Sequence, residues 1–211
     1  MKTSNAPQIK QIEAKASGCT DCGLSETRTQ VVFGEGNADA ALTLVGEGPG
    51  DQEDRRGRPF VGKAGKLLDE VMGDAQIRRE DIWLTNVIKC RACVTEDGFT
   101  RNRPPKMEEI KACHKWLDAE LNLIQPAVIV CIGAPAANRL IHRNFKMTQE
   151  RGRWFTDTQY APFAIAALHP AYILRLHGDD FNAARRYLVE DLIEAREKAE
   201  DAPQRQQLTL F

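Results

Sequence analysis

The sequence has no apolar run that approaches the roughly 20 residues needed to span a bilayer. Its first eight residues, Met-Lys-Thr-Ser-Asn-Ala-Pro-Gln, lack the apolar segment of a secretory signal peptide. Net charge is nearly absent as well, at −1 over 211 residues, so the total charge indicates no particular partner. We therefore expect a cytoplasmic protein without a membrane segment.

Two common phosphate-binding motifs are also missing. The loop at 46–62 contains Gly46-x-Gly48-x-Gly50, but Asp51 takes the place of the third glycine of G-x-G-x-x-G. An acidic side chain there would repel a pyrophosphate. No G-x-x-x-x-G-K-[ST] motif occurs. Binding of a nucleotide cofactor is therefore disfavoured.

The apolar residues that are present make up 42% of the chain, enough for a substantial core in one domain. Four short apolar runs without polar alternation lie between helical segments, a pattern typical of a parallel sheet covered on both faces. These runs are 41–45, 82–90, 127–132 and 162–168. We predict an α/β fold: a single three-layer α/β/α domain at 1–198 around a mostly parallel four-stranded sheet, with a flexible tail at 199–211.

Apolar residues recur every three or four positions in the segments between the strands, which predicts helices. The predicted helices are 8–17, 63–73, 106–124, a segment ending at 141, 171–176 and 180–198. We predict a polar loop at 91–105 and a candidate edge strand at 153–156.

Polar residues gather where the predicted strands end. Glu47, Asn86, Gly133 and His169 all lie at or just after the carboxyl end of a strand. In open α/β sheets, ligands bind outside these ends. We therefore expect the four residues to share one site, with 46–62 as its main loop.

The side chains of this site indicate a planar, uncharged ligand. Asn86 can offer a donor and an acceptor to one edge of a pyrimidine base. Phe60 is either a core residue or a stacking face for a base. The loop acids Glu47 and Asp51 could position a proton or a water. The simplest interpretation of the arginines in this loop is that they are solvent-exposed charges.

Six cysteines in a chain expected to be cytoplasmic favour metal binding over disulfides. One candidate is a zinc site with the ligands Cys19, Cys22, Cys90 and Cys93. Its two C-x-x-C pairs are further apart in the sequence than in zinc ribbons. The other is an iron–sulfur site: Cys19, Cys22, Cys90 and Cys113. Spacing alone does not choose between them. Cys131 lies inside an apolar run and is expected to be a core residue.

Four motifs in a fixed order resemble those of family 4 uracil-DNA glycosylases, the iron–sulfur type. They are Gly46-Glu-Gly-Pro-Gly50 followed by Glu53-Asp54, Gly57-x-Pro59-Phe60-Val61-Gly62, Thr85-Asn86-Val-x-Lys89-Cys90-Arg91, and His169-Pro170-x-Tyr172-x-Leu174-Arg175. The resemblance covers about residues 15–195. It implies a monofunctional hydrolase that removes uracil from DNA in base excision repair.

The resemblance also implies roles for individual residues. Phe60 would stack on the flipped uracil, Asn86 would read its edge, and the backbone of Gly46 and Gly48 would line the pocket. Glu47 and Asp51 would position or activate water, and His169 would stabilise charge on the uracil O2. DNA contacts would come from Arg55, Arg58, Gly133, Tyr172 and Arg175. A 4Fe–4S cluster would be held by Cys19, Cys22, Cys90 and Cys113.

The chain departs from the family pattern between Cys90 and Cys113, where 94–101 looks inserted. The sequence around Asp51 also resembles that of relatives that bind uracil-DNA covalently. Those relatives carry an Arg-Arg-Ile-His loop in the region of the insertion at 94–101. No His occurs between Cys90 and Cys113, which disfavours covalent trapping by that route. The alternative to a glycosylase is a non-catalytic or covalently trapping uracil-DNA binding protein.

The chain ends in an apolar peptide after a polar tail. Gln207-Leu-Thr-Leu-Phe211 resembles the bacterial sliding-clamp-binding peptide, through Gln207, Leu208, Leu210 and Phe211. We expect a monomer that associates with the nucleoid, binds uracil-containing DNA and attaches to the sliding clamp through this tail.

Overall fold

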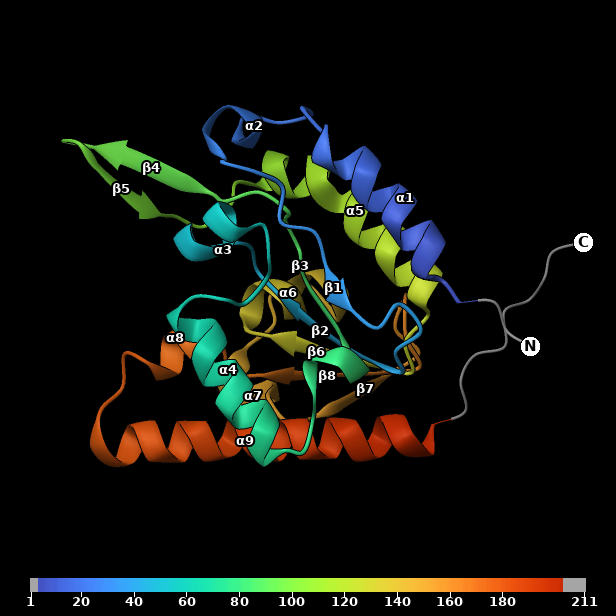
Figure 1. Ribbon diagram of the computed structural model, residues 1–211. Coiled ribbons are helices and arrows are strands. Elements are labelled where there is room, and N and C mark those ends of the chain that lie inside the picture. Colours follow the sequence, from blue (N-terminus) through green and yellow to red (C-terminus); the bar gives the residue numbers. More distant parts are fainter. Residues whose placement is uncertain (1–3, 203–211) are drawn as a thin grey trace, which may run out of the picture.

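The computed structural model describes residues 4–202 and contains a central sheet between two layers of helices (Figure 1). The strand order is β1-β3-β2-β6-β8-β7. The inner four strands are parallel and buried: β2 (Leu42–Gly46), β3 (Trp83–Asn86), β6 (Val128–Ile132) and β8 (Phe163–Ala167). The predicted three-layer α/β/α fold is confirmed.

The predicted strand number is wrong, because the sheet has six strands rather than four. The two additional strands are short antiparallel edges, β1 (Glu35–Gly36) and β7 (Trp154–Thr156). The second of these is the candidate edge strand at 153–156. The first is only two residues long and therefore carries no periodic signal.

Side chains on the inner strands alternate between two cores. Leu42 and Leu44 pack with α4 (Lys63–Asp74) and α9 (Gly178–Asp201) on one face of the sheet. Val45 packs with α5 (Met107–Ile124) and α6 (Ala134–Leu140) on the other. The helix α1 (Ala6–Ser17) lies against α5. Every inner strand is thus covered on both faces, as its continuous apolar run requires.

Several short elements surround the carboxyl ends of the parallel strands. They are α2 (Leu24–Thr27), α3 (Asp51–Arg56), α7 (Met147–Glu150) and α8 (Pro170–Ile173). The 3-10 turn η1 (Arg79–Asp81) lies instead at the amino end of β3. The loop predicted at 46–62 therefore contains a helix. It begins after Gly50, where Asp51, Glu53 and Asp54 place negative charge in the first turn.

The prediction of a polar loop at 91–105 is wrong. Residues 93–102 form an antiparallel hairpin, β4 (Cys93–Glu96) with β5 (Phe99–Asn102), which projects from the body of the molecule (Figure 1). Its turn is Asp97-Gly98, and both residues have positive φ, 50° and 80°. That dipeptide is a strong hairpin signal.

The described part of the chain, 4–202, has no helix that is both long and apolar enough to cross a membrane. The helix α9 continues to Asp201, three residues past the boundary predicted at 198. The peptide Gln207–Phe211 lies outside the described residues.

Candidate active site and thiol pocket

A cleft of about 610 Å³ opens at the carboxyl ends of β2, β3 and β8. The strand register explains why distant motifs meet there, since Gly46 at the end of β2 pairs with Asn86 at the end of β3. Seven of the residues predicted for the site line this cleft: Glu47, Gly48, Asp51, Phe60, Asn86, His169 and Arg175.

Gly46 lies behind this lining, between two of the lining side chains. A Cβ at this position would overlap the Asn86 amide oxygen and would lie 2.6 Å from Cζ of Phe60. The absence of a side chain therefore lets the Phe60 ring and the Asn86 amide approach each other. Both side chains are largely buried, with 5% and 4% of their surface exposed. The result is an aromatic ring beside a hydrogen-bonding amide.

His169 follows β8 and caps α8. Its Nδ1 accepts a hydrogen bond from the backbone N–H of Ala171, at 3.0 Å. Burial, and then the positive charge of Arg175, lower the pKa of His169 to about 4. The imidazole is therefore neutral at physiological pH, and since Nδ1 accepts, the proton lies on Nε2. The site holds a neutral imidazole with one N–H available as a donor.

Gly133 lies behind His169 and does not line the cleft. It has φ +93°, and a Cβ there would lie 3.1 Å from Cβ of His169. This glycine thus makes room for the imidazole. Its contact with DNA stays a prediction.

The two acids of the loop have opposite electrostatic environments. Burial raises the pKa of Glu47, which lies half-buried in the cleft. Burial alone would also raise the pKa of Asp51, but its ion pairs with Arg55 at 3.0 Å and Arg91 at 2.8 Å outweigh that and lower it. Glu47 is therefore the better proton acceptor, and Asp51 remains an anion.

The arginines and the tyrosine predicted to contact DNA differ in their availability. Arg175 lines the cleft, and its guanidinium lies 5.9 Å from the ring centre of Tyr172, which is 45% exposed. Arg55 is occupied by Asp51, and Arg58 binds Glu35 through two hydrogen bonds of 2.7 and 3.2 Å. Among residues 4–202, Arg175 and Tyr172 have no ion-pair partner, whereas the two loop arginines are paired with carboxylates.

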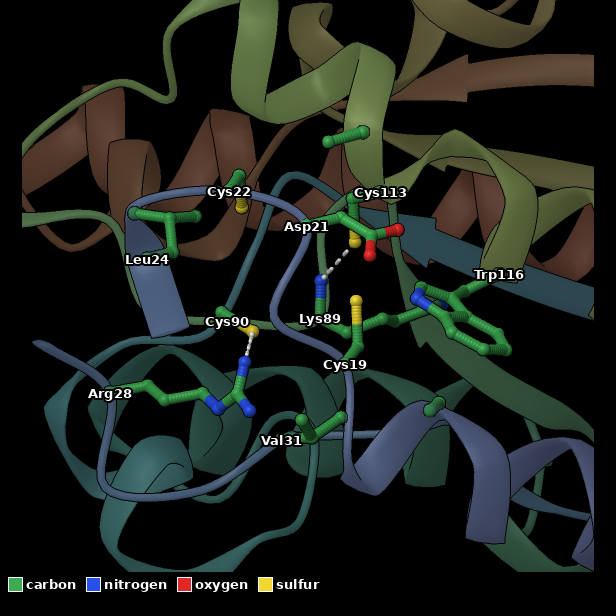
Figure 2. Close-up of a pocket in the computed structure, with 12 residues that line it drawn as sticks. Cys19, Asp21, Cys22, Leu24, Arg28, Val31, Lys89, Cys90, Cys113 and Trp116 are labelled. Carbon is green, nitrogen blue, oxygen red and sulfur yellow. Dashed lines mark hydrogen bonds between the residues drawn. The ribbon is translucent and has the colours of Figure 1, made fainter. Parts of the chain in front are cut away.

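A second, smaller pocket lies between the loop after α1, the end of β3 and α5, and Figure 2 shows its lining. Four thiols line it: Cys19, Cys22, Cys90 and Cys113. Cys93 lies on β4 and does not line it. No three His, Cys, Asp or Glu side chains within residues 4–202 surround a point where one metal ion could sit. The structure thus brings together the cysteines of the iron–sulfur set and not those of the zinc set.

Two of these sulfurs receive N–H donors. Arg28 Nη1 lies 3.3 Å from Sγ of Cys90, and the backbone N of Lys89 lies 3.1 Å from Sγ of Cys113 (Figure 2). Burial raises the pKa of both thiols, that of Cys113 to about 12. Such buried sulfurs need either a proton or a bound cation to balance the thiolate charge.

The uracil-DNA glycosylase superfamily model matches residues 33–193. A Type-4 uracil-DNA glycosylase from Thermotoga maritima is 40% identical over 189 residues, which cover 88% of this chain and 91% of the relative. Another from Archaeoglobus fulgidus is 38% identical over 79% of this chain and 83% of the relative. A third, from Sulfurisphaera tokodaii, is 34% identical over 90% and 84%.

This chain belongs to the uracil-DNA glycosylase superfamily. The resemblance found in the four motifs is thereby confirmed. The match includes β2, β3, β6 and β8, so it contains every strand end that contributes to the cleft.

The sequence motifs gave no role to Glu53, but its carboxylate accepts three backbone hydrogen bonds within the loop at 46–62. Its Oε1 accepts from the backbone N–H groups of Val61 and Gly62, at 2.9 and 2.7 Å, and its Oε2 accepts from that of Gly50, at 3.1 Å. One carboxylate thus ties the start of α3 to the start of α4. A Glu at the third helical position is the sequence signal of such a capping box.

We expect Glu53→Gln to lower the free energy of unfolding by about 1.5–3 kcal/mol, because an amide NH₂ would face one of these N–H groups. Urea denaturation measures the change. Glu70→Gln, on the exposed face of α4, is the matched control and should leave the midpoint unchanged. Equal midpoints for both variants would contradict this role of Glu53.

The sequence motifs also did not predict a buried network of charged and polar groups between β3 and α5. Lys89 Nζ donates to Glu120 Oε2 at 2.5 Å, to Thr85 Oγ1 at 2.5 Å and to the backbone oxygen of Asn86 at 2.9 Å. Lys89 and Glu120 are 1% and 0% exposed, so removing either side chain would leave the other buried without its partner. The network supports the backbone of Asn86 from the side opposite the cleft.

Proposed function

We propose that this protein is a monofunctional uracil-DNA glycosylase that hydrolyses the N-glycosidic bond of deoxyuridine in DNA and leaves an abasic site for base excision repair. One observation carries the proposal: an aromatic ring, an amide and a neutral imidazole meet in one cleft at the sheet's carboxyl edge. Phe60, Asn86 and His169 offer what a flipped uracil requires, namely a stacking face, a base-edge reader and a donor to a carbonyl oxygen.

Recognition begins with extrusion of the nucleotide, because a duplex hides the glycosidic bond. The extruded base then stacks on Phe60 while the Asn86 amide pairs with its edge. The two side chains touch the same glycine, Gly46, so their relative position is fixed. The amide's donor and acceptor match the adjacent O4 and N3–H of uracil, whereas cytosine presents an amino group and an unprotonated nitrogen there.

Cleavage moves negative charge onto the uracil and positive charge onto the sugar. His169 Nε2–H donates to the uracil O2 as this charge develops, and a neutral donor needs no proton transfer to do so. Glu47, with its raised pKa, holds the attacking water and accepts its proton. Asp51, held as an anion by Arg55 and Arg91, adds negative charge at the cleft.

We propose that Cys19, Cys22, Cys90 and Cys113 hold a 4Fe–4S cluster, as the family resemblance implies. The residues fit such a group, since four thiols line one pocket. Arg28 and the Lys89 backbone supply N–H donors to two of the sulfurs. When bound, the cluster would cross-link the segment before α2, the segment after β3 and α5, and it would take no part in the hydrolysis.

The DNA around the flipped nucleotide is proposed to contact the exposed end of α8. Tyr172 and Leu174 are 45% and 41% exposed, and Arg175 lies beside them at the cleft. Apolar side chains there can replace the extruded base in the stack, while the arginine contacts phosphate. Arg55 and Arg58 would reach phosphates only by exchanging their carboxylate partners.

Incubating the purified protein with a uracil-containing oligonucleotide, followed by alkali, tests this function. We expect a strand break at the uracil position and no break in the thymine control. A stable protein–DNA band without a strand break would instead support the alternative, a non-catalytic or covalently trapping uracil-DNA binding protein.

We also propose a cytoplasmic, nucleoid-associated monomer that the sliding clamp recruits through Gln207, Leu208, Leu210 and Phe211. Deletion of 207–211 is expected to abolish clamp binding, because the tail's apolar anchors are lost, and to leave cleavage of free oligonucleotides intact. Surface plasmon resonance with immobilised clamp measures the first effect. Unchanged clamp affinity after the deletion would contradict the proposal.

A further inference from the structure

Phe60 has a backbone conformation that L-residues rarely adopt. Its φ is +53°, in the left-handed region, although it is neither glycine nor asparagine. Such a conformation is unfavourable for a bulky side chain and persists only where surrounding contacts impose it. Phe60 lies between α3 and α4 and lines the cleft, so its strain falls on a residue of the site.

Arg79 binds the backbone on both sides of this residue, while Glu53 holds the N–H of the next one, Val61. Nη2 of Arg79 donates to the backbone oxygen of Phe60, and its Nη1 donates to that of Pro59 at 3.3 Å. One planar guanidinium therefore binds two successive carbonyls. Gly65 leaves room for the arrangement, because a Cβ there would overlap the Phe60 carbonyl group.

Arg79 is itself fixed from two further directions. Its Nη1 pairs with Glu35 Oε1 on β1 at 2.5 Å, and its Nε pairs with Asp69 Oδ1 on α4 at 2.7 Å. All three guanidinium nitrogens thus have partners, a geometry that a lysine ammonium cannot reproduce. The sheet edge, α4 and the loop are joined through this one side chain, which is 23% exposed.

We propose that Arg79 is a positioning residue for base recognition. By holding the carbonyls of Pro59 and Phe60 it keeps the Phe60 backbone left-handed, and this aims the ring at Gly46, beside the Asn86 amide. Arg79 is not among the described residues that line the cleft, so it acts through Phe60. The inference rests on the proposed function, since stacking on uracil is what makes the ring position matter.

A double-mutant cycle tests this inference. The four proteins are wild type, Arg79→Ala, Phe60→Ala and the double variant, each measured for inhibition by free uracil and for KM and kcat on a uracil oligonucleotide. Arg78→Ala is the matched control, because the ion pairs of the neighbouring Arg78 within residues 4–202 are exposed pairs with Glu80 and Asp81. Cluster absorbance and melting temperature report on folding.

We expect Arg79→Ala to weaken uracil inhibition about tenfold, the order of one lost base–aromatic stack. The same substitution in the Phe60→Ala background should change it less than about twofold, because the ring it positions is gone. If Arg79→Ala unfolds below the assay temperature, Arg79→Lys enters the same cycle under the same criterion.

Equal losses in the two backgrounds would overturn the inference, as would an Arg79 variant that behaves like Arg78→Ala. A wild-type protein that releases no uracil would instead contradict the proposed function. The two failures are therefore distinguishable.

Discussion

Replacing His169 with asparagine is expected to lower kcat about 100- to 1000-fold, the usual cost of losing one donor to a developing oxyanion. Asparagine is a good helix cap, and its side-chain oxygen can accept the Ala171 N–H that Nδ1 accepts now. It cannot place a donor where Nε2 lies. The substitution therefore removes the proposed hydrogen bond to the uracil O2 and preserves the start of α8.

Single-turnover kinetics with a uracil oligonucleotide measure the effect, and the melting temperature near pH 7 serves as the structural control. We expect the melting temperature to stay close to that of wild type, although kcat falls by the stated factor. A variant that retains kcat within about threefold would show that Nε2–H does not stabilise the leaving uracil.

The lowered pKa of His169 also has a consequence for stability. The folded pKa is about 4 and the ordinary value is 6.5, so the unfolded chain binds more protons between these two pH values. The free energy of unfolding therefore falls as the pH drops from 6.5 towards 4. His169→Asn removes this contribution, and its melting temperature should depend less on pH across that interval.

Cys113→Ala is expected to abolish the visible absorbance of the purified protein, whereas Cys93→Ala should leave it unchanged. The first substitution removes one of the four thiols that line the pocket, and the second removes a thiol on the hairpin outside it. Iron–sulfur clusters absorb visible light, and zinc is a colourless d¹⁰ ion. Absorbance spectra and iron analysis are the measurements.

Loss of the cluster should also lower the melting temperature of Cys113→Ala, because the segment before α2 would lose its attachment to α5 and to the end of β3. Cys93→Ala is the matched control for the loss of one thiol. If Cys93→Ala lost the absorbance and Cys113→Ala kept it, the proposed ligand set would be wrong, and Cys93 rather than Cys113 would be the fourth ligand.

The layers of the fold and the position of the site could be predicted from the sequence for one physical reason. Strands buried on both faces must be apolar throughout, so their ends are visible where polar residues such as Glu47, Asn86 and His169 begin. Parallel strands place those ends at one edge. The cleft at that edge therefore follows from the strand boundaries.

The edge strands and the hairpin were harder to predict. Residues 35–36 join the sheet through backbone hydrogen bonds to β3, which no side-chain pattern encodes. The hairpin is mostly exposed, so no core imposes a regular alternation of apolar residues on it. Its turn, Asp97-Gly98, was nevertheless a recognisable signal that sequence analysis did not use.

The supporting residues of the site could not be predicted, because their roles depend on backbone geometry. Glu53 acts by accepting three N–H groups, and Arg79 acts on two carbonyls, so neither contact depends on the identity of the residue bound. The left-handed φ of Phe60 also has no sequence signal comparable to glycine. Side chains that line the cleft were predicted from their chemistry, whereas the side chains that hold the backbone required the structure.

Release of free uracil under multiple turnover is the most direct test of the account. With DNA substrate in large excess, we expect many free uracil molecules per protein molecule, together with unmodified abasic DNA, when the products are separated by chromatography. Release of at most one uracil per protein, with the protein attached to DNA, would contradict it, and so would the absence of any uracil release.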